Sequence, residues 1–573
     1  MILQALTSLF EDLTRKGVLS KPGWSSVKIS FALCLDGDGR LESLVPRMKE
    51  ETVGKKTVLR PRTMELPAPV TRTVGVLPNF LWDNSSYLLG VDGKGKPERS
   101  KNCFQACARL HHQLLDEIDT PTARGILHFL DTWEPEKAQE VPALKESWED
   151  LMKGGNLVFR VAGIYPWEDP EICAAWDRHY AAEEGETVQC MVTGGQVVPE
   201  AVHPAIKGIA GAQSSGAALV SFNAPAFCSY GKEQSLNAPM GKYAAFAYTA
   251  ALNYLLSDRE NVQRIGDTTV VCWAEEAEPQ YNLLANFAIF GMDTEAPITR
   301  EELVAAVGRL AQGLPCPELG VEARQNFYIL GIAPNSARLS VRFFYRSTFG
   351  ELMAHVRAHH ERMEIAGSRE PMMPLWKLLR ETVNLNSKDK SPSPVMAGAV
   401  ARAIFAGTAY PASLLEATML RIRSERNITP GRAAILKAYY LKNTHPQCPK
   451  EVLTVSLNEN STNIPYTLGR LFAIYEWVQE TANPKINTTI KDKYFSSAAA
   501  TPATIFPVLD NLAQKHLRKL KPGQQVDFDK KIGQIKNILG ETYPVRQTLP
   551  EQGSFNLGYY HQKQNRYTKK EEK

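Results

Sequence analysis

Between His203 and Asn237 the chain combines glycines, serines and side-chain amides with few charged residues. Glycine lets a backbone approach a ligand closely and reach positive φ. Serine, asparagine and glutamine supply hydrogen-bond donors and acceptors without charge. This chemistry favours a surface that reads the polar edges of a ligand, and its candidate contacts are Gly211, Gln213, Ser214, Ser215 and Asn223. The same composition is also typical of ordinary turns, so the segment alone leaves a purely structural interpretation open.

A serine nucleophile is a second interpretation of this segment. The run Ala212-Gln213-Ser214-Ser215-Gly216 resembles the G-x-S-x-G elbow, with alanine in place of the first glycine. That elbow requires a buried strand before the serine and a helix after it. Pro204, Gly208 and Gly211 precede Ser214, and they are poor strand formers. A hydrolase or nuclease that uses Ser214 or His203 therefore remains only an alternative.

Cations that can hold phosphates occur in four places. A proline-containing basic loop between Pro46 and Arg72 is expected to be extended. The glycine-rich segment has two lysines, and the C-terminal helical region has a basic end. A hairpin is predicted from strands 327–332 and 339–343, with its arginines on the face opposite Leu339, Val341 and Phe343. The phosphate-contact candidates are Lys55, Lys56, Arg72, Lys207, Lys232, Arg338, Arg342, Lys515, Arg518 and Lys519. Each set is also compatible with a solvated protein face.

The elements that must position these residues indicate an α+β protein. We expect a mixed α/β N-terminal and central region with antiparallel sheet, followed by an α-helical bundle at the C-terminus. The predicted domains are an N-terminal α+β domain at 1–100, which carries the basic loop, and a central α+β domain at 101–386. A Ser/Pro-rich linker at 387–394 leads to the helical bundle at 395–573.

Composition narrows the class of protein. The chain has 573 residues, nine cysteines and a formal net charge of +4. An odd number of scattered cysteines, without a signal peptide or a long apolar run, predicts reduced thiols in a cytoplasmic protein that does not enter a membrane. Cys103 and Cys107 lack the second cluster that a zinc site requires, so no metal is expected. The small net charge neither requires nor excludes a nucleic-acid partner.

Several runs, in this order along the chain, resemble the large subunit of the type I-C CRISPR Cascade, an RNA-guided surveillance complex. They are Leu81-Trp82-Asp83-Asn84, His203-Pro204-Ala205-Ile206-Lys207-Gly208, Gly211-Ala212-Gln213-Ser214-Ser215-Gly216, Ser229-Tyr230-Gly231-Lys232, Gly266-Asp267-Thr268-Thr269, Pro334-Asn335, Leu468-Gly469-Arg470-Leu471-Phe472 and Gly558-Tyr559-Tyr560-His561-Gln562. The resemblance covers nearly the whole chain.

The resemblance implies a subunit without a catalytic centre or a cofactor. Such a subunit recognises the short motif adjacent to the target (PAM) in duplex DNA, helps to open the duplex and stabilises the displaced single strand, while guide RNA reads the target by base pairing. Implied partners are the guide RNA, the target double-stranded DNA, the backbone and crRNA-processing subunits, a small subunit and a helicase-nuclease. The later part of the C-terminal bundle is implied to be made separately as that small subunit.

Within this family we assign the PAM-proximal role to two loops. The Gln213-Ser214-Ser215 loop and the turn that contains Asn79 and Asn84 are expected to approach the base edges. Amides, hydroxyls and backbone N–H groups suit the acceptors and the single donor of a minor groove. A purely structural scaffold, whose basic groups bind only guide RNA, is the other alternative.

Overall fold

The computed structural model describes residues 1–53, 56–70, 75–93, 95–182, 185–258, 262–291, 297–370, 372–388 and 390–567, without the side chains of 51–53 and 56–58. It divides into two compact units. The first unit comprises Met1, Leu3–Pro204 and Phe222–Ala251, and the second comprises Ile2, Ala205–Ser221 and Leu252–Lys573. The predicted domains at 1–100, 101–386 and 395–573 follow a different division, because the glycine-rich segment itself is shared between the two units.

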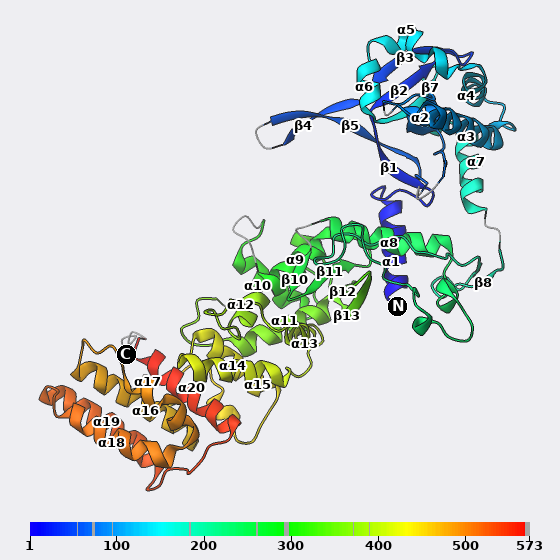
Figure 1. The fold of residues 1–573 in the computed structure, drawn as a ribbon. Helices are drawn as coiled ribbons and strands as arrows, with labels where there is room; N and C mark the ends of the chain where they lie inside the picture. Colours follow the sequence, from blue (N-terminus) through cyan, green and yellow to red (C-terminus); the bar gives the residue numbers. More distant parts are fainter. Residues whose placement is uncertain are drawn as a thin grey trace. The chain divides into compact units, whose positions relative to one another are not determined.

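The first unit contains two larger sheets and a set of helices (Figure 1). Its strands are β1 (Trp24–Ile29), β2 (Phe31–Leu35), β3 (Leu41–Pro46), β4 (Met48–Val53), β5 (Lys56–Pro67), β6 (Trp82–Asn84), β7 (Asn156–Val161), β8 (Val188–Gln189) and β9 (Gln196–Val197). Its helices are α1 (Ile2–Arg15), α2 (Ser85–Leu88), α3 (Pro97–Leu115), α4 (Pro121–Thr132), α5 (Pro142–Lys145), α6 (Trp148–Lys153) and α7 (Pro170–Ala181), with short turns η1 (Pro135–Glu140), η2 (Pro166–Glu168), η3 (Pro225–Phe227) and η4 (Gln234–Asn237).

The core of the first unit lies between a mixed sheet and its helices. That sheet has the order β3-β2-β7-β6, with β2 and β7 parallel and the other pairs antiparallel. Leu33 and Phe159 on the sheet pack with Phe129 of α4, and Phe80 stacks on Trp176 of α7 with ring centroids 5.4 Å apart. The core therefore joins residues that are more than a hundred positions apart in the chain.

The second unit begins with an antiparallel sheet and continues into helices (Figure 1). The sheet order is β10 (Gln263–Ile265), β11 (Thr268–Ala274), β12 (Asn326–Asn335) and β13 (Arg338–Thr348). The helices are α9 (Pro279–Phe290), α10 (Arg300–Leu310), α11 (Phe349–Met363), α12 (Leu375–Arg380), α13 (Pro394–Phe405), α14 (Ala412–Glu425), α15 (Pro430–Lys442), α16 (Ile464–Ala482), α17 (Ile490–Ala500), α18 (Pro502–Leu517), α19 (Pro522–Leu539) and α20 (Leu549–Asn565), with turns η5 (Pro317–Leu319) and η6 (Lys450–Val452). Helix α8 (Lys242–Ser257) contributes residues to both units.

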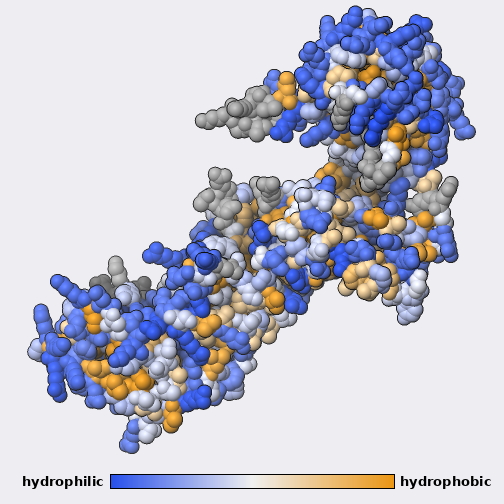
Figure 2. Space-filling view, in the orientation of Figure 1, coloured by the Kyte–Doolittle hydropathy of each residue, from blue (hydrophilic) through white to orange (hydrophobic). Residues whose placement is uncertain are grey.

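The predicted α+β fold is confirmed: antiparallel sheets occupy the N-terminal and central regions, and helices make up the C-terminal region. One hydrophobic core extends through the second unit from Ile265 to Tyr560. It includes residues on both sides of the predicted linker at 387–394; for example, the rings of Phe343 and Phe405 lie 5.9 Å apart. Hydrophilic residues cover much of the face of each unit seen in Figure 2.

Helices α16 and α20 cross at two glycines, and they lie side by side in Figure 1. A Cβ atom added at Gly469 would lie 2.0 Å from the carbonyl oxygen of Phe555, and one added at Gly558 would lie 2.0 Å from that of Tyr466. The crossing therefore has no room for any side chain at these two positions. It also brings together the last two runs that carry the family resemblance, 468–472 and 558–562.

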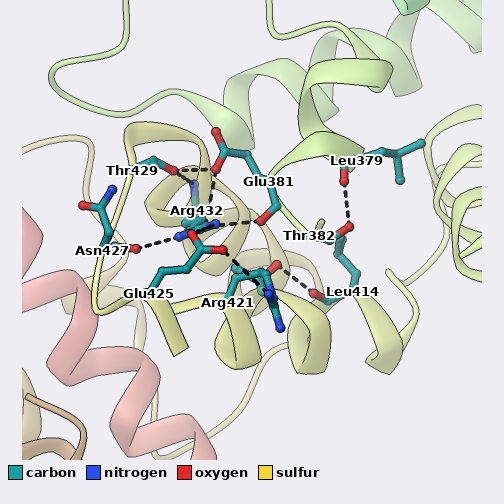
Figure 3. Close-up of polar contacts among 10 residues, drawn as sticks. Leu379, Glu381, Thr382, Leu414, Arg421, Glu425, Asn427, Thr429 and Arg432 are labelled. Carbon is teal, nitrogen blue, oxygen red and sulfur yellow. Dashed lines mark hydrogen bonds and ion pairs between the residues drawn. The ribbon is translucent and has the colours of Figure 1, made fainter. Parts of the chain in front are cut away.

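Arg432 of α15 joins three segments of the second unit through the polar contacts of its buried guanidinium (Figure 3). Its guanidinium donates to the carbonyl oxygens of Glu381, at 3.2 Å, and Asn427, at 2.9 Å. Its Nη2 also lies 2.6 Å from a carboxylate oxygen of Glu425 at the end of α14. Thr429, the N-cap of α15, donates to the Glu381 carboxylate at 2.6 Å. This network holds the α14–α15 connection against the segment after α12.

Candidate nucleic-acid interface

The glycine-rich segment of the second unit forms a closed surface loop, which we call the amide loop (residues 207–216). At its base, Ile206 and Ala217 exchange two backbone hydrogen bonds of 3.0 and 2.9 Å. Both side chains are buried, as is Ile209 inside the loop. These apolar anchors fix the ends of the loop, while the polar residues between them remain at the surface.

The amide loop is supported by the β12–β13 hairpin and by α8. The N–H of Ala218 donates to the carbonyl of Ala337 at 3.1 Å, and the N–H of Leu339 donates to the carbonyl of Ala218 at 2.9 Å. The Asn253 side chain accepts from the N–H of Lys207 at 2.8 Å and donates to the carbonyl of Ala205 at 3.1 Å. The base of the loop is therefore attached to regular structure on two sides, which limits its freedom.

Glycines make the turns of this loop possible. Gly208, Gly211 and Gly216 have φ of 86°, 82° and 100°, a region that other residues rarely adopt. A Cβ at Gly216 would also lie 2.9 Å from the carbonyl oxygen of Ile206. The tip between Gly211 and Gly216 presents Gln213, Ser214 and Ser215, and all three are exposed. The tip is thus an uncharged array of one amide and two hydroxyls, with Lys207 exposed at the base.

The surroundings of Ser214 do not form a nucleophile elbow. No helix or strand of the described chain adjoins Ser214, whereas the elbow places its serine between a buried strand and a helix. His203, the other candidate, is buried in the first unit, where its Nδ1 lies 2.8 Å from the hydroxyl of Tyr248. Burial lowers the pKa of His203 below its ordinary value.

The turn that contains Asn79 and Asn84 has a structural role in the first unit. Asn79 is only 4% exposed, and its side-chain oxygen accepts from the N–H of Val70 at 3.0 Å. Asn84 caps α2 by accepting from the N–H of Ser86 at 3.0 Å. Neither amide oxygen is free to contact a base, because both satisfy backbone donors. We therefore leave both asparagines out of the proposed interface, and their contact with base edges stays a prediction.

His111 stabilises the same turn as a buried neutral ring. Its Nε2 accepts from the N–H of Leu81 at 3.0 Å, and its Nδ1 lies 2.8 Å from the carbonyl oxygen of Cys107. Leu81 has φ of 68°, so this hydrogen bond holds a strained residue in place. Burial lowers the pKa of His111 to about 4.

Acid is therefore expected to destabilise the first unit through His111. Below pH 6.5 the unfolded chain binds a proton that the folded ring does not, so the free energy of unfolding falls between pH 6.5 and pH 4, by about 3 kcal/mol in total. We expect His111→Gln to reduce this pH dependence when unfolding is followed by hydrogen exchange of the segment around Leu81. His128→Gln on the exposed side of α4 is the control. Equal pH slopes for the wild type and His111→Gln would contradict the assignment.

The predicted basic loop is instead a hairpin of two strands, which we call the basic ribbon (residues 48–53 and 56–61). β1 pairs only with the inner half of β5, so the outer half pairs with β4 alone and extends from the sheets of its own unit (Figure 1). Lys49 lies directly opposite Arg60, and both are exposed. The ribbon therefore presents positive charge from both of its strands.

The three phosphate-contact candidates between Pro46 and Arg72 have different outcomes. Lys55 and Arg72 lie outside the described residues. Lys56 begins β5 opposite Val53, and its side chain is not described. Lys49 and Arg60 belong to the same basic loop in the sequence but are not among its phosphate-contact candidates.

A bulge in the β12–β13 hairpin alters the predicted arginine face. Ile332 pairs with Val341 and Gly331 pairs with Phe343, so the register shifts at Arg342. Val341 therefore faces away from Phe343 and is 42% exposed, contrary to the predicted alternation. Arg342 forms an ion pair with Asp267 at 2.8 Å, while Arg338 lies beside the amide loop, where its strand bridges Ala218.

The remaining cations are exposed at the surface. Lys515, Arg518 and Lys519 lie at the end of α18 and form no ion pair with any described residue, whereas Lys531 and Lys536 of α19 are paired with Asp527 and Asp510. In the first unit Lys232 is exposed in a tight turn, and Asn223 is exposed as well. Asn223 thus belongs to a different compact unit from Gln213.

These features define a protein with an exposed amide loop, a basic ribbon and several exposed cations. Among the described residues, no group of three or more His, Cys, Asp or Glu could hold a metal ion, and all nine cysteines are free thiols. No helix in the described part of the chain has both the length and the apolar character needed to cross a bilayer.

Comparison with known proteins places this chain in a class of CRISPR-associated proteins. A family model described as CRISPR-associated protein (Cas_Csd1) matches residues 6–567, and the chain therefore belongs to this family. No curated protein matches the chain. The resemblance found in the sequence is thus confirmed at the level of a Cascade-type CRISPR protein, which works in a complex with other Cas proteins and nucleic acid.

Proposed function

We propose that this protein is the non-catalytic large subunit of a type I-C surveillance complex, in which it recognises the PAM in duplex DNA. In this role it helps to unwind the target, stabilises the displaced strand and supports recruitment of a helicase-nuclease. Family membership supports the CRISPR assignment. The observation that carries the specific role is the exposed, uncharged amide loop held by buried anchors at its base.

The chemistry of the amide loop matches base edges better than phosphates. A minor groove presents acceptors on A·T pairs and one additional donor on G·C pairs. Gln213 offers both an amide donor and an acceptor, and the two serine hydroxyls can serve as either. Phosphates are bound chiefly through positive charge, which the tip lacks. We therefore assign base contacts to the tip and phosphate contacts to Lys207, Lys232 and the basic ribbon.

Replacing both Gln213 and Ser214 by alanine tests this proposal in the assembled complex. Losing one good bidentate base contact costs about 1–3 kcal/mol of discrimination. We therefore expect affinity for a guide-matched duplex with the correct PAM to fall by roughly 5- to 150-fold, with a smaller loss for a mismatched PAM. Equilibrium binding to the two duplexes measures the change.

Gln524→Ala is the matched control, because Gln524 is an exposed glutamine on α19 in the same unit. It should leave both affinities unchanged. If the Gln213/Ser214 variant retains wild-type affinity and PAM preference, the amide loop is structural and the assignment of base contacts is wrong.

A guide-RNA scaffold is the second candidate, and the exposed cations Lys515, Arg518 and Lys519 favour it because charge binds RNA and DNA backbones alike. Photocrosslinking of the complex separates the two roles. Crosslinks to target DNA at the amide loop support the PAM reader, whereas crosslinks confined to guide RNA support the scaffold. Turnover by the purified protein that disappears in Ser214→Ala would instead support a hydrolase.

A further inference from the structure

A tight turn in the first unit places an aromatic ring in an unfavourable backbone conformation. The N–H of Lys232 donates to the carbonyl of Ser229 at 3.0 Å. The two central residues, Tyr230 and Gly231, have φ of 54° and 70°. Positive φ at both central positions is the pattern of a type I′ turn, which strongly prefers asparagine, aspartate or glycine. Tyrosine at the first central position is therefore not explained by the turn itself.

The turn is held rigidly by Asn237. Its side-chain oxygen accepts from the N–H of Ser229 at 2.9 Å. Its amide nitrogen donates to the carbonyl oxygens of Lys232, at 3.0 Å, and Gln234, at 3.1 Å. Because the Asn237 side chain bonds to both ends of the turn, the orientation of Tyr230 is fixed before any ligand binds.

Tyr230 receives no compensating contact from the described chain. It is 99% exposed, so its ring buries almost no area against the protein. Tyr230 thus strains the backbone without gaining any packing in return. Such an outlier indicates that the side chain contacts a binding partner. Aspartate, asparagine or glycine would form the same turn with less strain.

We propose that Tyr230 stacks on an unpaired base of nucleic acid bound by the complex. The inference rests on the proposed function, since it requires nucleic acid at this surface. Every base has a π-face, and an exposed aromatic ring on a rigid turn is a stacking platform for it. The Tyr230 ring carries no charge, so its own contribution to affinity comes from stacking and depends little on salt.

The experiment compares complexes assembled with the wild type, Tyr230→Asn and Tyr230→Phe. Asparagine fits the turn and removes the ring, whereas phenylalanine keeps the ring and removes only the hydroxyl. We expect Tyr230→Asn to weaken binding of guide-matched target DNA by about 5- to 150-fold, with an unchanged salt slope and an equal or higher Tm. Tyr230→Phe is expected to stay within about 2-fold of the wild type.

Photocrosslinking identifies the source of the base. One complex carries 5-iodouracil in the guide RNA and a second carries it in the target DNA. We expect one of the two to crosslink at Tyr230, and the strand labelled in that complex contains the stacked base. Three outcomes would each overturn the proposal. They are an unchanged affinity in Tyr230→Asn, a loss of affinity in Tyr230→Phe as large as that in Tyr230→Asn, and failure of Tyr230→Asn to enter the complex. The last outcome would indicate that Tyr230 contacts another protein. If the wild-type chain adds no target binding to the complex at all, the proposed function itself fails.

Discussion

Replacing Gly469 by alanine is expected to lower the free energy of unfolding of the second unit by about 3 kcal/mol or more. The new Cβ would lie 2.0 Å from the carbonyl oxygen of Phe555 and 2.8 Å from the backbone nitrogen of Tyr559. Backbone atoms of α20 cannot rotate away as a flexible side chain can. The two helices would have to separate, and their buried contacts, including the ring contact between Phe472 and Tyr559, would weaken. Urea unfolding of the whole chain measures the loss.

A second glycine in the same unit provides the matched control. Gly533 lies inside α19, and a Cβ there would meet nothing within 4 Å. Gly533→Ala should therefore stabilise the unit by about 0.5–1 kcal/mol through helix propensity. Gly558→Ala should resemble Gly469→Ala, and the double variant should cost less than the sum because both clash at one crossing. Equal stability of Gly469→Ala and Gly533→Ala would show that the crossing tolerates side chains.

The sequence was sufficient for features that depend on local pattern. The α+β class and the β12–β13 hairpin followed from alternation and helical periodicity, and both are confirmed. The exposure of Gln213, Ser214 and Ser215 also follows from their type, since polar residues between glycines rarely become buried. Whether these residues contact a base stays a prediction.

Features that depend on the details of strand pairing and on burial were not predicted. The prolines of the basic ribbon predict an extended loop, yet Pro61 lies opposite Met48 in the pairing of β4 with β5. Val341 was placed on the wrong face because the bulge at Arg342 depends on the partner strand. Asn79 resembled a surface turn residue, but Asp83 and Val70 bind it inside the unit.

Arg432→Met is expected to destabilise the second unit by about 2–3 kcal/mol, because it removes a buried guanidinium that donates to two backbone carbonyl oxygens and pairs with a partly exposed carboxylate. Arg432 is 3% exposed. Its loss would leave the Glu425 carboxylate without its 2.6 Å partner and the carbonyl oxygens of Glu381 and Asn427 without their donors. Thermal and urea unfolding measure the change, and hydrogen exchange should show the α14–α15 connection opening first.

Two further variants separate the charge of Arg432 from its geometry. Arg432→Lys keeps the charge but cannot reach three partners as the planar guanidinium does, so it should recover only part of the lost stability. Arg421→Met removes the more distant partner of Glu425, at 3.7 Å, and should cost at most about 1 kcal/mol because Glu425 keeps Arg432. The network in Figure 3 thus predicts a fixed order of stability, with the wild type and Arg421→Met above Arg432→Lys, and Arg432→Met lowest. A methionine variant as stable as the wild type would mean that packing alone holds α14, α15 and the segment after α12 together.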